Sequence, residues 1–206
     1  KNEWYDKAPT KNSVGVAIAR KWIAMPNADY SASDNCTILA VAIRGGGYEN
    51  EWGGNFNVGS DTEHAGFAAA REQVIDAVKK YQKKYAVTGK VKVWITGYSR
   101  AAATANLVAA YLDKSSGSGE FGFVYSPGDI YAYCFEPPAP TSDSQRGNSL
   151  YKNIFSIVNQ HDFVPMVVMN KWNYGRYGVT KYLPSAQTNK NYKYMITGVR
   201  TKFKTY

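Results

Sequence analysis

A strand that turns sharply into a helix is the feature that most constrains this chain. Residues 91–96 (VKVWIT) are rich in β-branched and aromatic residues, whereas 101–113 (AAATANLVAAYLD) are rich in alanine and favour a helix. The turn 97–101 (GYSRA) joins them. A strand and a helix that cross so closely require small residues two positions before and two after Ser99, and the chain has glycine and alanine there. We therefore expect a strand-turn-helix unit with Ser99 at its apex.

Other segments continue this alternation of strands and helices. The run 37–43 is almost wholly apolar and ends at Arg44 and three glycines, which is typical of a buried strand followed by a tight loop. From 65 to 85, apolar residues recur at three- and four-residue spacing, which predicts an amphipathic helix. Further strands are expected at 13–23, 130–135 and 153–158. The pattern predicts an α/β fold, with a mainly parallel central sheet and helices on both faces.

The composition is that of one folded domain. At 206 residues and 44% hydrophobic, the chain can bury one substantial core but is too short for two ordinary domains. No run of about 18 apolar residues is present, so the chain as given does not span a membrane. The first residue is Lys1 rather than Met, which suggests that an N-terminal stretch was removed, and a cleaved signal peptide is one explanation.

The net charge suggests a class of partner, and the cysteine positions indicate whether a disulfide is expected. The formal net charge of +9 favours an acidic partner, such as an anionic membrane or a bacterial wall polymer. Because no nucleic-acid-binding signature and no metal-ligand spacing occur, we expect no nucleic acid, no metal and no cofactor. Cys36 and Cys134 lie on strands predicted to flank a third, about 10 Å apart and beyond disulfide reach, so two thiols are expected.

The turn at Ser99 also has the arrangement of a nucleophile elbow, which holds a serine oxygen above the edge of a sheet. The helix that follows points backbone N–H groups and the positive end of its dipole at the place where an oxyanion would form. The alternative interpretation is an ordinary turn in which Ser99 caps the helix N-terminus.

Five stretches of the chain, in this order and spacing, carry a resemblance to a known family. They are 40–46 (AVAIRGG), 52–56 (WGGNF), 63–67 (EHAGF), 95–102 (ITGYSRAA) and 157–165 (IVNQHDFVP). Together they resemble the class 3 lipase family, and more closely a bacterial lipase-like branch, within the α/β-hydrolase fold. The resemblance covers most of the chain.

This resemblance implies roles for particular residues. Ser99 would be the nucleophile, and Asp162 the acid that orients a catalytic histidine. The backbone N–H groups of Gly46 and Arg100 would form the oxyanion hole. The family commonly has Thr or Ser where Gly46 stands, so a side-chain contribution to the hole is missing here. Glu136, which follows the next predicted strand, is the alternative for the acid.

The histidine that such chemistry requires is not evident. The chain has two histidines, His64 and His161, whereas the family places the base after the acid, and none occurs from 163 to 206. Because His161 is adjacent to Asp162, the two side chains are expected to point apart. Two explanations stay open: residues 1–206 are a single domain that lacks its C-terminal segment, or the domain has lost catalysis. The range 178–206 would then begin a lid or a subdomain.

Two functions follow from these observations. The first is a serine hydrolase that cleaves carboxylic esters, from lipids or short acyl groups, through an acyl-enzyme on Ser99. The alternative is a catalytically incomplete domain that binds anionic surface polymers or membranes through its basic exterior. The resemblance and the missing start methionine favour a protein that is secreted or held at a bacterial cell surface.

Overall fold

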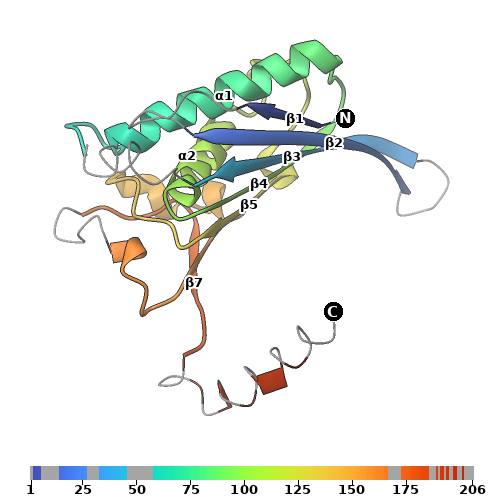
Figure 1. The fold of residues 1–206 in the computed structure, drawn as a ribbon. Helices are drawn as coiled ribbons and strands as arrows, with labels where there is room; N and C mark the ends of the chain where they lie inside the picture. The colour runs from blue at the N-terminus through green and yellow to red at the C-terminus, as the bar shows by residue number, and fades with distance from the viewer. Residues whose placement is uncertain are drawn as a thin grey trace.

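A seven-stranded sheet forms the centre of the computed structural model, with its strands in the same order as in the sequence (Figure 1). The structure describes residues 2–5, 14–26, 33–45, 58–166, 173–185, 189, 191, 192, 194, 197, 198 and 201. The strands are β1 (Asn2–Tyr5), β2 (Gly15–Pro26), β3 (Ser33–Arg44), β4 (Val91–Tyr98), β5 (Ile130–Phe135), β6 (Ile154–Val158) and β7 (Val179–Tyr182).

The sheet has an antiparallel part and a parallel part. Strands β1, β2 and β3 pair antiparallel, and β2 and β3 stay paired over twelve residues each, from Gly15 opposite Arg44 to Pro26 opposite Ser33. From β3 onward every neighbouring pair is parallel. The first parallel pair begins with Thr37 opposite Val91, so the start of β3 pairs with β2 alone. The expected mainly parallel α/β sheet is therefore confirmed, with an antiparallel edge.

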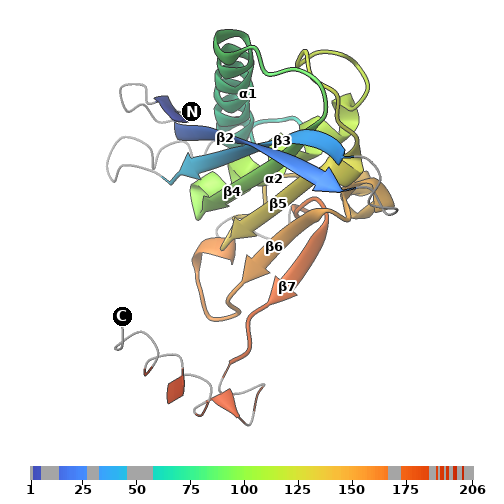
Figure 2. The same ribbon diagram turned by 90° about the vertical axis from the view of Figure 1, so that its right-hand side faces the viewer.

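Two helices cover one face of the sheet. They are α1 (Ala65–Tyr85) and α2 (Arg100–Ser115), which pack on each other, and α2 contacts β4 and β5 most extensively. Figure 2 shows β2 to β7 side by side with α2 behind them. Nearly all of α2 is buried, and most of its residues are alanine or other apolar residues, although Arg100, Asn106 and Asp113 are buried as well. In the ranges that the structure describes, α1 and α2 lie on this same face. The sequence predicted helices on both faces of the sheet, and the described residues show α-helices on one of them.

Helix α1 ends where its backbone turns left-handed. Ala86 has φ 47°, and its N–H bonds to the carbonyl groups of Gln82 and Lys83. This closes the last turn in the usual manner of a C-terminal cap. Lys83 and Lys84 lie in that turn, where positive charge interacts favourably with the helix dipole. None of the helices in the described ranges is long and apolar enough to cross a bilayer.

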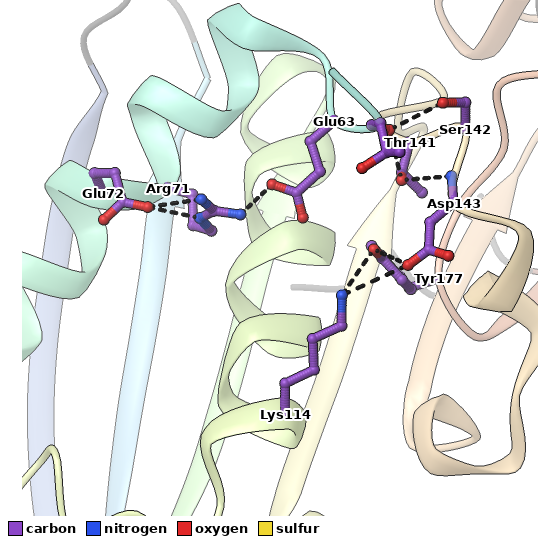
Figure 3. A network of polar contacts seen from close by, with 9 residues as sticks. Glu63, Arg71, Glu72, Lys114, Thr141, Ser142, Asp143 and Tyr177 are labelled. Atoms are coloured by element: carbon purple, nitrogen blue, oxygen red, sulfur yellow. Dashed lines mark hydrogen bonds and ion pairs between the residues drawn. The ribbon is translucent and has the colours of Figure 1, made fainter.

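A polar network fixes the long connection between β5 and β6 against both helices (Figure 3). The Asp143 carboxylate accepts a 2.8 Å hydrogen bond from Tyr177 Oη and lies 3.5 Å from Lys114 Nζ at the end of α2. Glu63, just before α1, bridges to the same connection and pairs with Arg71 of α1. The connection therefore has a defined path although it contains no long helix or strand.

Candidate active site

Ser99 lies in a strained backbone conformation between β4 and α2. Its φ is 57° and its ψ is −130°, a region that residues with a side chain rarely occupy. Gly97, two positions before Ser99, has no room for a side chain. A Cβ on this residue would lie 2.5 Å from the carbonyl oxygen of Ala101. That oxygen belongs to the backbone of α2 and cannot rotate away. The small residues noted in the sequence therefore allow β4 to meet α2 at this turn.

The hydrogen bonds of Ser99 separate it from a helix-capping serine. Its N–H donates to the Phe135 carbonyl at 2.9 Å, and its carbonyl accepts from Ala102 at 2.9 Å, which begins α2. A capping serine has extended backbone angles and accepts a helix N–H through its side chain. Ser99 has neither property. The side chain of this half-buried residue makes no capping hydrogen bond to α2, which begins at the next residue.

Arg100 and Gly46 were expected to supply the oxyanion hole. Arg100 is the first residue of α2, where helix N–H groups lack partners within the helix, and the residue is buried. Gly46 lies outside the described residues. Its neighbour Gly45 is described, and a Cβ there would lie 3.1 Å from the carbonyl oxygen of Tyr98. The end of β3 thus closely approaches the turn before Ser99.

Asp162 lies in the turn that follows β6. Its Oδ1 accepts a 2.9 Å hydrogen bond from the N–H of Val164, and its own N–H donates to the Asn159 carbonyl at 3.1 Å. Because β4, β5 and β6 are adjacent and parallel, Ser99 and Asp162 follow strands that end at the same edge of the sheet. Two strand spacings, about 10 Å, separate those strands. A bridging group such as an imidazole would have to lie between the two side chains.

Glu136 lies between these two turns and holds one of them. It follows β5, has a φ of 52° and is buried. Both of its carboxylate oxygens accept from the N–H of Asn159, each at 2.9 Å, and its own N–H donates to the Ile157 carbonyl at 2.9 Å. Glu136 was the sequence-based alternative for the catalytic acid. In the structure its carboxylate fixes the start of the turn that carries Asp162.

Arg176 ties the segment after β5 to the segment after β6 and was not found from the sequence. Its Nε donates to the Pro137 carbonyl at 2.8 Å, and an Nη donates to the Pro165 carbonyl at 2.7 Å. Burial lowers the pKa of this guanidinium, and the negative charge of Glu136 opposes part of the shift. These contacts join segments that are far apart in the chain, so no local pattern could have signalled them.

The two histidines occupy different surroundings. His64 is fully buried at the N-terminus of α1, where its ring stacks on Phe67 with centroids 4.2 Å apart. His161 is exposed, and its N–H donates to the Asn159 side-chain oxygen at 3.0 Å. The stacked ring of His64 contributes to the packing of α1. Neither contact identifies a catalytic base.

An open depression of about 440 Å³ lies beside the Ser99 turn. Its apolar walls are Ile43 at the end of β3, Tyr98 of β4 and Phe135 of β5. The Tyr98 and Phe135 side chains are 60% and 42% exposed. An apolar group bound here would therefore cover side chains that are now in contact with water.

The described residues show no cluster of three or more His, Cys, Asp or Glu that could hold a metal ion. Cys36 and Cys134 are both buried and not disulfide-bonded, and their strands β3 and β5 flank β4 as expected. Burial raises the pKa of the Cys134 thiol to about 12. This thiol stays protonated and is a poor nucleophile at neutral pH.

Fold and turn together define the class: an α/β protein of the hydrolase type with a serine at the end of a central strand. The family model for lipase (class 3) matches residues 40–172. The chain belongs to the class 3 lipase family. This confirms the resemblance found in the sequence.

Solved structures of fungal lipases share the fold. A fungal lipase-inhibitor complex is 19% identical with a TM-score of 0.57, covering 81% of this chain and 67% of that one. Lipase II from Rhizopus niveus is 16% identical with a TM-score of 0.60, covering 91% and 67%. The lipase from Rhizopus microsporus var. chinensis is 17% identical with a TM-score of 0.59, covering 88% and 61%. The chain thus spans about two thirds or less of their length, and no curated protein sequence matches it.

Proposed function

We propose that this protein is a serine hydrolase that cleaves carboxylic esters through an acyl-enzyme on Ser99. The observation that carries the proposal is the conformation of Ser99, which is held at positive φ between a buried strand and a helix N-terminus. Strain of this kind persists only where the surrounding structure enforces it, and it is concentrated at active sites. Membership of the class 3 lipase family supports the same conclusion.

In the proposed reaction, the Ser99 hydroxyl attacks the ester carbonyl while a base takes its proton. The turn acts as a nucleophile elbow, and the backbone N–H groups of Arg100 and Gly46 stabilise the oxyanion. The alcohol leaves, and water then hydrolyses the acyl-enzyme to regenerate Ser99. Asp162 is proposed to orient the base. The base itself stays unassigned between the histidines of this chain and a residue of a longer protein.

The depression beside Ser99 suggests the substrate class. Ile43, Tyr98 and Phe135 give it an apolar side that suits the acyl part of an ester, and Thr96 and Glu136 add polar groups to its lining. We therefore propose lipid or short-chain acyl esters as substrates.

The proposal is tested by hydrolysis of a short-chain chromogenic ester and by labelling with an organophosphate. Wild-type protein should turn over the ester and gain one phosphoryl adduct on Ser99. Ser99→Ala should lose about 10⁴-fold or more of the turnover and all of the adduct. Ser118→Ala, in an exposed loop, is the matched control and should behave as wild type. Turnover retained in Ser99→Ala, or an adduct on another serine, would reject the proposal.

The binding-module alternative rests on the net charge of +9 and on the absence of a histidine between 163 and 206. It predicts salt-sensitive binding to anionic vesicles or wall polymers that Ser99→Ala leaves unchanged. The family match favours the enzyme. A secreted or cell-surface location in a bacterium is proposed with either function, and fractionation of the producing cells would test it.

A further inference from the structure

A polar cleft of about 590 Å³ lies at the end of the sheet opposite Ser99. Its floor is formed by β2 and β3 near the start of β4, and its wall is the connection from α1 to β4, residues 86–90. Figure 1 shows β2 and β3 continuing past the other strands at this end of the sheet. Ser99 follows the other end of β4, and an eight-residue strand is about 26 Å long. The cleft is therefore separate from the candidate active site.

Four side chains of different chemistry form the floor of this cleft. Arg20 and Trp22 are two positions apart on β2, so their side chains lie on the same side of that strand. Asn35 and Thr37 have the same spacing on β3. Thr37 is directly opposite Trp22, and opposite residues of paired strands share a face. Since positions two apart on a strand are separated by about 7 Å, a cation, an aromatic ring, a hydroxyl and an amide lie close together.

Arg20 is a positive charge that is held in place without a carboxylate. Its Nη1 donates to the Tyr85 carbonyl at 2.7 Å, and its guanidinium lies 5.6 Å from the centroid of the Tyr85 ring. The residue is half-buried, and it forms no ion pair with any residue that the structure describes. A guanidinium has five N–H donors, and the contact with Tyr85 uses one. The other donors suit a carboxylate or phosphate group of a ligand.

Trp22 adds an exposed aromatic surface beside this charge. The residue is 64% exposed, although tryptophan has one of the largest apolar side chains. A ring of this kind gains contact area by covering an apolar surface, and the C–H faces of a sugar ring provide one. The Thr37 hydroxyl and the Asn35 amide are able to exchange hydrogen bonds with sugar hydroxyls. The floor therefore has the groups that a saccharide with an acidic substituent requires.

The wall of the cleft is fixed by hydrogen bonds to its surroundings. The Gln82 carbonyl of α1 accepts from the N–H of Val87 at 3.0 Å, and Gln82 Nε2 donates to the Val87 carbonyl at 3.1 Å. The N–H of Thr37 donates to the Lys90 carbonyl at 3.0 Å, which joins the wall to the floor. A site that is already formed loses little conformational entropy when a ligand binds.

We propose that this cleft binds a saccharide chain that carries carboxylate or phosphate groups, with a sugar ring on Trp22 and an acidic group on Arg20. The site is independent of the proposed hydrolase reaction and attaches the protein to an acidic polymer. Single-stranded nucleic acid also combines rings with phosphates, but proteins bind it through grooves in which many cations follow the backbone. Among the described residues that line the cleft, Arg20 and Lys90 are the basic ones. Two basic residues beside an amide and a hydroxyl favour the saccharide.

Calorimetry with two acidic probes tests the proposal. Hexagalacturonate presents carboxylates, and a glycerol phosphate chain substituted with sugars presents phosphates, so the tighter probe identifies the acidic group. Trp22→Ala and Arg20→Gln should each weaken its binding at least tenfold. Lys21→Gln is the matched control for charge, because Lys21 points to the opposite side of β2. Trp4→Ala, at a residue of β1 that is 53% exposed, is the control for an aromatic side chain. Both controls should bind as wild type does.

A measurement on the unmutated protein guards against effects of the substitutions on folding, since Arg20→Gln also removes a contact with Tyr85. Acrylamide quenching of Trp22 is obtained as the difference between wild type and Trp22→Phe. The tighter probe should protect Trp22 from acrylamide. Its uncharged counterpart, fully methyl-esterified hexagalacturonate or the sugar without glycerol phosphate, should bind at least tenfold more weakly.

The outcomes separate this proposal from the hydrolase. Ser99→Ala should bind the probes as wild type does, so the result does not depend on ester hydrolysis. Absence of binding to both probes, or binding that Trp22→Ala leaves unchanged, would overturn the proposal. Tighter binding of a thymidine oligonucleotide than of either probe would assign the cleft to nucleic acid and would overturn it as well.

Discussion

The turns after β4 and β6 carry the two proposed catalytic residues, and they are held in different ways. The turn at Ser99 is fixed by backbone packing, since Gly97 leaves no room for even a methyl group against α2. The turn at Asp162 is fixed by polar contacts from other segments, with Glu136 bonded to Asn159 and Arg176 bonded to Pro165. The steric contact at the first turn joins residues only four positions apart, Gly97 and Ala101. The second depends on residues distant in the chain.

This difference has a physical consequence. Steric packing of backbone against backbone does not depend on pH or on ionic state. Contacts through carboxylates do, because protonation changes what an oxygen can accept. Strand β6 has a carboxylate at each end, since Glu136 bonds to the turn that follows it and Asp113 bonds to Asn153 just before it. We therefore expect the turn after β4 to be disrupted by added side-chain volume. We expect the region around β6 to be sensitive to changes in the charge of its carboxylates.

The largest effect should come from Gly97→Ala. The added Cβ would lie 2.5 Å from the backbone oxygen of Ala101, so β4 or α2 must move. We expect the free energy of unfolding to fall by on the order of 4 kcal/mol, measured by urea denaturation. Gly147→Ala is the control, because nothing lies within 4 Å of its added Cβ, and its change should stay below about 0.5 kcal/mol. Equal stabilities of the two variants would show that the β4 turn is not sterically fixed.

Next in size is a pH-dependent effect of Asp113→Asn at the start of β6. Burial raises the pKa of Asp113 to about 7, and the hydrogen bond from Asn153 only partly opposes this. The folded protein therefore keeps a proton that the unfolded chain releases near pH 4. Wild type should lose about 1.4 kcal/mol of unfolding free energy per pH unit as the pH rises from about 4 to 7.

Asp113→Asn removes this titration while keeping an oxygen that can accept from Asn153. Urea denaturation should show the variant similar to wild type at pH 4 and more stable by a few kcal/mol at pH 8. A stability difference that does not change with pH would mean that Asp113 is ionised in the folded protein.

A smaller effect is expected from Glu136→Gln at the other end of β6. The amide keeps one acceptor for the Asn159 N–H but loses the charge and the second oxygen. We expect kcat for ester hydrolysis to fall about tenfold with little change in KM, because the Asp162 turn shifts relative to Ser99. Glu72→Gln, an exposed member of an ion pair, is the control. A loss of kcat equal to that of Ser99→Ala would instead make Glu136 the catalytic acid.

The smallest effect concerns the middle of β6. Ser156 is fully buried, and its hydroxyl has no hydrogen-bond partner among the described residues. Ser156→Ala should raise the free energy of unfolding by up to about 1 kcal/mol, because an unsatisfied polar group is removed. Thermal and urea denaturation would both detect this change. A clear loss of stability would indicate that the hydroxyl has a partner, such as a buried water.

The elements that the sequence predicted are those with a strong local pattern. The strands expected at 37–43, 91–96, 130–135 and 153–158 and the helices expected at 65–85 and 101–113 are confirmed to within a few residues. The strand expected at 13–23 corresponds to β2, which continues to Pro26. Strands β1 and β7 were not expected, because each has only four residues, all at least partly exposed, and no apolar run.

The residues of the candidate site also differ in whether a local sequence pattern could predict them. Ser99 was predicted as a site residue from its own neighbours, because the steric requirement of its turn is visible in nearby positions. Asp162 was predicted only through the family resemblance, and the catalytic roles of both residues stay predictions. Arg176 was not identified, because its partner Pro137 is 39 positions away and the contact uses a backbone carbonyl. Contacts of this kind leave no periodicity or motif in a sequence.

The order of the strands has a consequence for how the chain is made. Each strand pairs with the strand that comes just before it in the sequence. During synthesis, a strand that leaves the ribosome therefore finds its pairing edge already formed. No strand has to wait for a distant segment or insert between two that are already paired, and the entropy of closing long loops is kept small. The sheet can grow in one direction, from the N-terminal hairpin toward β7, at the pace of translation.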